Sequence, residues 1–187
     1  TREKVPNGLM PKLLEQAFIA AEDKRFYHHK GVDIWGISRA LITNIQQGRI
    51  KEGASTITQQ LARIVFLSQD QTFTRKIQEA ALAYKLEREL SKEEIIEQYL
   101  NNVYLGSGAY GVADAAWVYF SKKPVQLTLA ETALIAGLAP APSFYSPLIN
   151  PNKALERRSV VLDRMHQLGF INDIQRHKAR ISPLNIR

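Results

Sequence analysis

Apolar residues recur at three- and four-residue steps through most of this 187-residue chain. That spacing is typical of helices that bury one face. No pair of alternating apolar and polar runs flanks a tight turn, so a large sheet is not expected. We therefore predict a mainly α domain that spans residues 1–187, a length that can bury a sizeable core.

Several helix boundaries can be located from capping residues. The first helix should begin near Pro11, since proline is tolerated in a first turn. Asp33 can cap a second helix that ends around Gly48. Capping boxes open two later helices, with Ser91 three residues before Glu94 and Thr128 three residues before Glu131.

Two regions near the C-terminus have opposite character. The segment 133–139 is apolar on all sides, which indicates a buried central helix. Another helix is expected from Asn152 to Gly169. Residues 172–187 are polar and basic, so we expect a tail or linker there.

The net charge of the chain favours an anionic partner. Twenty-five Lys and Arg against eighteen Asp and Glu give +7, which favours phosphate, a nucleic acid or an acidic membrane surface. The absence of cysteine excludes a thiol nucleophile. No apolar run reaches the ~20 residues that cross a bilayer, and we see no signal peptide, although a soluble piece of a longer anchored protein would look the same.

The first polar stretch follows the first apolar helix and contains Glu22. Glu22 lies where that helix leaves the core, so its carboxylate is expected at the edge of an apolar wall. Partial desolvation disfavours the charged form, which suits a general acid or base. A solvated helix end with mixed charges is the plainer interpretation of the same residues.

A second polar segment could bind an anion. Gly53 relaxes the backbone before Ser55 and Thr56, which can cap a helix that carries Gln59, Gln60 and Arg63. The open N–H groups of a helix start, with hydroxyls beside them, favour negative charge. An ordinary capped helix is the alternative.

A third segment places cations near a carboxylate. On a long helix expected from Thr72 to Leu90, Arg75 and Lys76 stand four and three residues before Glu79. They can form in-helix ion pairs, or they can project into a cleft where the cations hold a phosphate. This helix is apolar around a wide arc, so we expect it to be packed on several sides.

The second helix carries an apolar stripe. Basic residues, Arg39, Arg49 and Lys51, lie beside it. Such a stripe is usually core, but one that contains Trp next to basic residues can also lie in a membrane interface. Its members are Ile34, Trp35, Ile37, Leu41, Ile42 and Ile45.

Five segments in a fixed order resemble the peptidoglycan glycosyltransferase domain of penicillin-binding proteins and monofunctional transglycosylases, glycosyltransferase family 51. The resemblance covers nearly the whole chain. One departure is the pair Arg63-Ile64, where the family usually has Lys-Asn. The segments are Glu22-Asp23 with Phe26, His29 and Gly31; residues 53–60; residues 75–79; residues 97–106; and Arg157-Arg158 with Val161, Leu162 and Met165.

The resemblance implies a lysozyme-like helical fold of two lobes around a central cleft, with a smaller membrane-proximal lobe at about residues 30–60. It implies polymerisation of lipid II into β-1,4-linked glycan, with inversion and release of polyprenyl pyrophosphate. Glu22 would be the general base and Glu79 a second catalytic carboxylate that orients the cations or a bound divalent cation.

The remaining site residues follow from the resemblance and from the apolar stripe of the second helix. Ile34, Trp35, Leu41 and Ile45 are the expected membrane contacts. A structural hydrogen bond suits His29 better than the role of a second base. The expected substrate and pyrophosphate contacts are Lys76, Arg75, Arg63, Ser55, Thr56, Gln59, Gln60, Asp23 and His29.

Expected partners are lipid II, the lipid-linked growing glycan and the membrane surface, with no nucleic acid. We expect no required cofactor, although Mg²⁺ or Mn²⁺ could assist the pyrophosphate. The implied location is the outer, periplasmic face of the cytoplasmic membrane in the bacterial envelope. A C-terminal transpeptidase domain and an N-terminal anchor could lie outside this chain.

Two alternatives use the same features differently. A muramidase or lytic transglycosylase also uses a cleft glutamate on a helical scaffold, but it needs no pyrophosphate site, so residues 53–60 and 75–79 would have no role. A basic nucleic-acid-binding module fits the charge. No segment looks like a recognition helix, and carboxylates are unhelpful beside phosphates.

Overall fold

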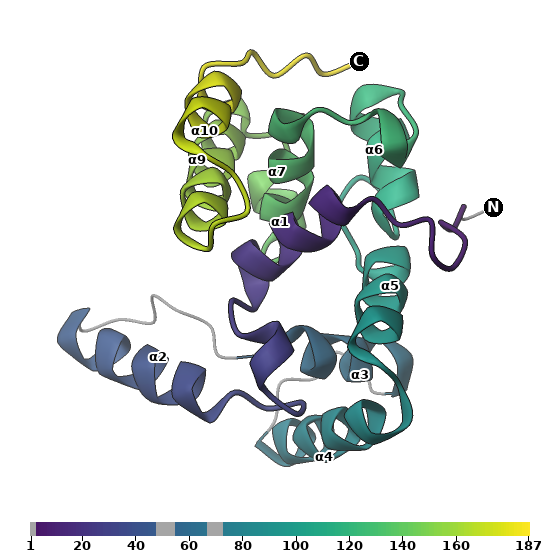
Figure 1. Cartoon of the computed structure of the whole chain (residues 1–187), viewed down its shortest axis with the longest axis vertical. Coiled ribbons are helices and arrows are strands. Elements are labelled where there is room, and N and C mark those ends of the chain that lie inside the picture. The colour runs from purple at the N-terminus through teal and green to yellow at the C-terminus, as the bar shows by residue number, and fades with distance from the viewer. Residues whose placement is uncertain (1–2, 48–54, 67–72) are drawn as a thin grey trace. The chain divides into compact units, whose positions relative to one another are not determined.

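The computed structural model describes residues 3–47, 55–66 and 73–187. These residues form helices and no strand, apart from one bridge between Tyr104 and Tyr110, so the predicted mainly α class is confirmed (Figure 1). Two 3₁₀ helices, η1 (Phe26–His28) and η2 (Pro124–Gln126), lie between α-helices. The α-helices are α1 (Lys12–Glu22), α2 (Ile34–Gln47), α3 (Ile57–Phe66), α4 (Phe73–Glu89), α5 (Lys92–Asn102), α6 (Val112–Phe120), α7 (Leu129–Leu138), α8 (Pro142–Tyr145), α9 (Pro151–Gln167) and α10 (Asp173–Arg180).

The predicted capping boxes are present. The Ser91 hydroxyl accepts from the Glu94 N–H at 3.1 Å, and the Glu94 carboxylate accepts from the Ser91 N–H at 3.1 Å. Thr128 and Glu131 exchange the same two bonds at 3.2 and 2.9 Å. These bonds satisfy N–H groups that a helix start leaves without a partner. The starts of α5 and α7 could therefore be predicted from the sequence.

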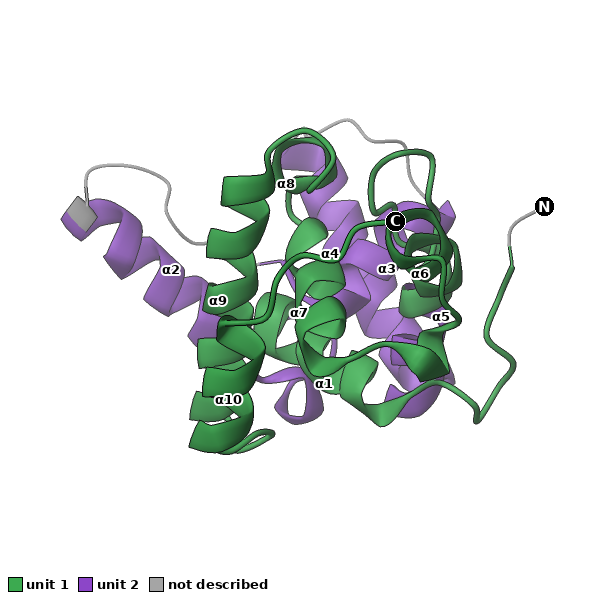
Figure 2. Cartoon of the chain, turned by 90° about the horizontal axis from the view of Figure 1, so that it is seen from above, with its two compact units in different colours: residues 1–24, 100–187 green, residues 25–99 purple. Residues whose placement is uncertain are grey.

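The chain divides into two compact units (Figure 2). Unit 1 comprises residues 1–24 and 100–187, and unit 2 comprises residues 25–99. The predicted smaller lobe, at about residues 30–60, falls within unit 2. The lobe boundary and the central cleft stay predictions.

Helix α7 forms the centre of unit 1. Every residue from Ala130 to Leu138 is buried, and α7 packs against α1, α6, α8, α9 and α10 (Figure 1). A helix with neighbours on every side has no polar face to present to water. The predicted buried central helix is confirmed.

Helix α10 corrects the expectation of a tail from residue 172. The Asn172 side chain accepts from the Gln175 N–H at 2.8 Å, and the Gln175 side chain accepts from the Asn172 N–H at 2.9 Å. Ala179 is buried, and α10 packs on α9 and α7. The segment is mostly polar and basic, which suggested a tail, but Asn172 three residues before Gln175 is a capping box that signals a helix start.

In unit 2 the loop after η1 crosses α4 at very close range. Gly31 has φ +110°, and a Cβ on it would lie 2.8 Å from the carbonyl carbon of Ala83, so only glycine fits. The Thr56 hydroxyl donates to the Gly31 carbonyl at 2.6 Å, and α3 packs on α4. The loop, the start of α3 and α4 therefore form one packed block.

The apolar stripe of α2 is not core. Ile34, Trp35 and Ile45 are at least 70% exposed, and Leu41 is 60% exposed. Helix α2 extends away from α3 and α4 within unit 2 in both views (Figures 1 and 2). Gly48, Arg49 and Lys51 lie outside the described residues. The stripe could have been a buried face or a membrane contact, and these exposures exclude a buried face for its described residues.

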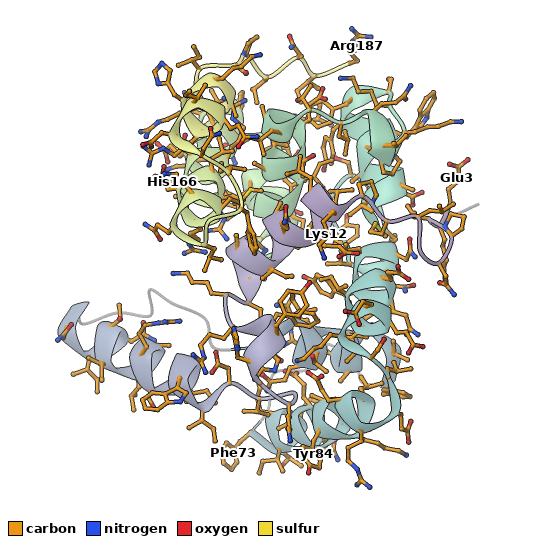
Figure 3. All side chains as sticks on the ribbon, viewed as in Figure 1. Glu3, Lys12, Phe73, Tyr84, His166 and Arg187 are labelled. Carbon is orange, nitrogen blue, oxygen red and sulfur yellow. The ribbon has the colours of Figure 1, made fainter. Side chains whose placement is uncertain are left out.

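Helix α4 is also more exposed than its sequence predicted. Phe73 and Tyr84, both labelled in Figure 3, are 82% and 53% exposed, whereas Glu79, Ala83 and Leu86 are buried. The expectation of packing on several sides was wrong because the apolar arc is only partly covered. No helix in the described parts of the chain is both long enough and apolar enough to cross a bilayer.

Candidate functional site

Glu22 is the last residue of α1 in unit 1, at the predicted edge of the core. Its side chain is 10% exposed, and its Oε2 lies 3.9 Å from Nη2 of Arg157 on α9. Arg164, also on α9, donates to the carbonyl of Ala21 at 2.8 Å and fixes the end of α1. Asp23 follows as the C-cap and is buried, with its N–H bonded to the Ile19 carbonyl at 2.9 Å.

Arg157 was not assigned a role from the sequence, although it belongs to the fifth motif. Its Nε donates to the Gly137 carbonyl at 3.4 Å, and its guanidinium lies 5.7 Å from the centre of the Tyr145 ring. Its side chain is 14% exposed. Membership of the fifth motif was the signal that could have marked Arg157 as a site residue.

A cluster of four side chains forms in unit 2. Arg63 on α3 donates to both carboxylate oxygens of Glu79 on α4, at 2.9 and 3.1 Å. Lys76 Nζ donates to Glu79 Oε1 at 3.1 Å and to the Ser55 hydroxyl at 2.7 Å. We call Ser55, Arg63, Lys76 and Glu79 the phosphate cluster. The structure thus brings together residues from two predicted motifs.

Glu79 is almost fully buried, with a side chain that is 2% exposed. Burial alone would raise its pKa, but the hydrogen bonds and charges of Arg63 and Lys76 outweigh burial and hold the pKa of Glu79 below its ordinary value of 4.5. The carboxylate is therefore ionised near neutral pH. It orients Arg63 and Lys76, which together carry more positive charge than Glu79 carries negative charge.

Other predicted contacts of the second motif have structural partners. Thr56 and Gln59 form a capping box, with the Gln59 side chain accepting from the Thr56 N–H at 2.9 Å. The Gln60 side chain accepts from the hydroxyl of Tyr99 at 2.9 Å. Gly53 lies outside the described residues. Substrate contacts by Thr56, Gln59 and Gln60 stay predictions, whereas Ser55 of the same motif accepts a hydrogen bond from Lys76.

His29 is buried and makes the structural hydrogen bond that we expected. Its Nδ1 accepts from the Gly31 N–H at 3.0 Å and lies 3.5 Å from Glu87 Oε2. Glu87 also accepts from Lys92 at 2.6 Å and from the Thr58 hydroxyl at 2.9 Å. Sequence reasoning missed Glu87 and Lys92, because they lie on two successive helices and no helical spacing links them.

The Arg75 side chain hydrogen-bonds to Gln78, whereas Lys76 hydrogen-bonds to Glu79. Arg75 Nη1 donates to the Gln78 side chain at 3.1 Å in an exposed position. No group of three or more His, Cys, Asp or Glu that could hold a metal occurs among residues 3–47, 55–66 and 73–187. Around Glu79 the described side chains are one carboxylate, one hydroxyl and two cations, a set that does not suit a divalent metal.

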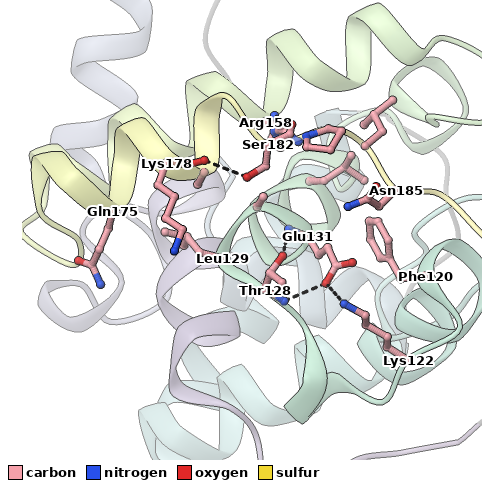
Figure 4. Close-up of a pocket in the computed structure, with 15 residues that line it drawn as sticks. Phe120, Lys122, Thr128, Leu129, Glu131, Arg158, Gln175, Lys178, Ser182 and Asn185 are labelled. Atoms are coloured by element: carbon pink, nitrogen blue, oxygen red, sulfur yellow. Dashed lines mark hydrogen bonds and ion pairs between the residues drawn. The ribbon is translucent and has the colours of Figure 1, made fainter.

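A pocket of about 390 Å³ in unit 1 contains none of the predicted site residues (Figure 4). Buried Arg158 lines it and donates to the carbonyls of Arg180 and Ser182 at 3.0 and 2.7 Å. Burial lowers the pKa of Arg158 from its ordinary value. Since these carbonyls lie at the end of α10, Arg158 caps that helix, which accounts for the second arginine of the fifth motif.

Glu22 therefore stands in unit 1 and the phosphate cluster in unit 2. Each is preformed within its own unit. That the two face one groove stays a prediction.

Comparisons with known proteins agree with the resemblance seen in the sequence. The sequence model of a family described as Transglycosylase matches residues 1–166. Penicillin-binding protein 1A of Neisseria flavescens is 53% identical over 169 residues, which are 90% of this chain and 21% of that protein. A protein of Cupriavidus necator that is provisionally named a transglycosylase is 48% identical over 187 residues, which are 100% of this chain and 80% of that protein.

A solved structure shares the fold. The crystal structure of penicillin-binding protein 1A from Haemophilus influenzae matches with a TM-score of 0.60 and 26% identity, over 100% of this chain and 18% of that chain. This chain spans about a fifth of the length of the penicillin-binding protein 1A relatives. The family match covers most of the chain, and the family predicted from the five segments is confirmed: the chain belongs to the transglycosylase family.

Proposed function

We propose that this chain is a peptidoglycan glycosyltransferase that polymerises lipid II into β-1,4-linked glycan with inversion and releases polyprenyl pyrophosphate. The observation that carries the proposal is the phosphate cluster, where Arg63 and Lys76 are held by Glu79 and Ser55. A lysozyme-like muramidase has no use for such a cluster. The relatives named penicillin-binding protein 1A also favour synthesis over cleavage.

The phosphate cluster suits a leaving group that gains negative charge. As the anomeric bond breaks, electrons move to the pyrophosphate oxygen, and cations that are fixed beforehand stabilise this charge without reorganisation. Lys76 is 40% exposed and Arg63 is 20% exposed, so both can still reach a ligand. Glu79 acts by positioning these cations.

Glu22 is proposed as the general base. It would take the proton from the 4-hydroxyl of the acceptor while that oxygen attacks the anomeric carbon of the donor. General-base catalysis typically contributes ~10²–10⁴-fold. We propose that no cofactor is required; among the described side chains of the phosphate cluster, Glu79 is the one carboxylate that could bind Mg²⁺ or Mn²⁺.

The exposed face of α2 is proposed as a membrane contact. Polyprenyl tails leave a bilayer at a cost of ~0.8 kcal/mol per CH₂, so the enzyme must come to the lipid. Ile34, Trp35, Leu41 and Ile45 supply an apolar surface. This fits the periplasmic face of the cytoplasmic membrane, and we propose an anchor and a transpeptidase domain as further parts of the whole protein.

Replacing Trp35 and Leu41 together with Gln should weaken binding to vesicles of phosphatidylglycerol and phosphatidylcholine by about tenfold or more, because two apolar side chains would no longer enter the bilayer. Co-sedimentation measures the bound fraction. Val125→Gln is the control, since Val125 is 79% exposed in unit 1. Equal binding by the double variant and wild type would contradict the proposed contact.

The activity itself is tested with two substrates in parallel. Incubation with lipid II should give glycan polymer and polyprenyl pyrophosphate, which gel separation and mass spectrometry detect. Incubation with preformed, uncrosslinked glycan should leave its length unchanged. Fragments from the second reaction without polymer from the first would replace the proposal with the muramidase alternative.

A further inference from the structure

Arg157 is held beside Glu22 by three contacts within unit 1. Its Nε donates to the Gly137 carbonyl of α7 at 3.4 Å, and its guanidinium lies over the Tyr145 ring at 5.7 Å. Its Nη2 is 3.9 Å from Glu22 Oε2. Helices α1, α7 and α9 pack together, and α8, which carries Tyr145, packs on α7 and α9, so the three contacts lie within one group of packed helices (Figure 1).

Gly137 fixes the path of the arginine side chain. A Cβ on Gly137 would lie 2.8 Å from Cγ of Arg157, so the aliphatic stem of Arg157 lies directly across the glycine. Any larger residue at position 137 must displace that stem. The distance between the guanidinium and Glu22 is therefore set by the packing of α9 on α7.

This distance has an electrostatic consequence. The Glu22 side chain is only 10% exposed, so desolvation disfavours its ionised form, whereas a guanidinium nearby favours it. At 3.9 Å the Nη2 and Oε2 atoms are too far apart for a good hydrogen bond. Arg157 thus acts on this oxygen through charge.

Other charged groups on α1, and on the helices packed against it, have partners of their own. On α9, Arg164 donates to the Ala21 carbonyl at 2.8 Å. On α7 the one titratable residue, Glu131, pairs with Lys122 at 2.7 Å. On α1, Glu15 pairs with Lys12 at 3.6 Å, and Asp23 follows Glu22 as a further negative charge. Arg157 carries a positive charge 3.9 Å from the Glu22 carboxylate.

We propose that Arg157 is a positioning residue that keeps Glu22 ionised, and so competent as a base, and that Gly137 sets the distance at which it does so. The inference rests on the proposed function. It gives a role to the first arginine of the fifth motif, which is distinct from the helix-capping role of Arg158.

The test is the pH dependence of lipid II polymerisation by Arg157→Gln and Arg157→Lys. In Arg157→Gln the acid limb of the profile should move to higher pH by about one unit, so activity falls about tenfold on that limb and recovers as the pH is raised. Arg157→Lys keeps a charge and should move the limb by less than half as much. A uniform loss at all pH values would show a merely structural role and overturn the inference.

Gly137→Ala provides an independent variant that leaves both charges in place. Alanine suits a helix better than glycine, so thermal unfolding should show an intact fold. Displacement of the Arg157 stem should move the acid limb in the same direction as Arg157→Gln. An unshifted limb in a folded Gly137→Ala variant would contradict the role given to Gly137.

A readout without turnover separates this inference from the proposed function. Carbon-13 NMR of the Glu22 carboxyl, assigned with Glu22→Gln, should show titration at higher pH in Arg157→Gln than in wild type. If Glu22→Gln retains polymerisation, the proposed base is wrong. If Glu22→Gln is inactive but Arg157→Gln leaves both the titration and the acid limb unshifted, only the inference on Arg157 fails.

Discussion

The end of α1 and the phosphate cluster each place a shielded glutamate beside arginine, but at different distances. Glu79 receives two hydrogen bonds from Arg63 and one from Lys76, all between 2.9 and 3.1 Å. Glu22 lies 3.9 Å from Arg157. The three hydrogen bonds to Glu79 serve to fix its cations, whereas we propose that the guanidinium 3.9 Å from Glu22 keeps that carboxylate ionised and still able to take up a proton.

The first prediction concerns the carboxylate at the end of α1. Glu22→Gln should lower the turnover of lipid II by about 10²–10⁴-fold, because an amide cannot accept the hydroxyl proton. Initial rates of pyrophosphate release measure the effect. Glu156→Gln, at a 69% exposed position on α9, should retain wild-type turnover. A Glu22→Gln rate within about threefold of wild type would remove Glu22 as the base.

The second prediction concerns the cations that Glu79 holds. Lys76→Met should lower kcat/KM for lipid II by about 10²–10³-fold, since one preorganised charge on the leaving group is lost. Lys85→Met is the matched control, because Lys85 is exposed on the same helix. Equal rates for the two variants would show that Lys76 does not contact the pyrophosphate.

The third prediction uses the pH dependence of stability. The pKa of Glu79 is lowered in the folded protein, so its contribution is present above its ordinary value of 4.5 and is lost as the pH falls through the folded pKa. Glu79→Gln should lower the free energy of unfolding by about 1–3 kcal/mol near pH 7. The difference from wild type should shrink towards about pH 3.

Urea unfolding at both pH values measures the effect of Glu79→Gln. Glu89→Gln, at the exposed end of α4, is the control and should change stability little at either pH. A Glu79→Gln difference that is constant across this range would indicate that the carboxylate is not held ionised by Arg63 and Lys76.

Local patterns predicted much of this fold. Capping boxes located the starts of α5 and α7, and uniform apolarity marked α7 as central, because both properties depend on residues close in sequence. The pair between Lys76 and Glu79 followed from helical spacing. The five motifs identified the family before any geometry was known.

Tertiary packing decided what the sequence left open. The stripe of α2 resembles a buried face, yet Ile34, Trp35 and Leu41 are exposed, because periodicity does not reveal what covers a helix. Arg63 lies sixteen residues before Glu79 and meets it only because α3 packs on α4. The approach of Arg157 to Glu22 likewise needs α9 and α1 to be neighbours.

The central claim is that Glu22 and the phosphate cluster act on the same pair of substrates. A crystal structure of the Glu22→Gln variant with bound lipid II tests it directly, since slow turnover would preserve the substrate. The account predicts the donor pyrophosphate against Lys76 and Arg63, with the acceptor 4-hydroxyl within hydrogen-bonding distance of residue 22. A pyrophosphate bound away from Lys76, or a sugar hydroxyl far from residue 22, would contradict the account.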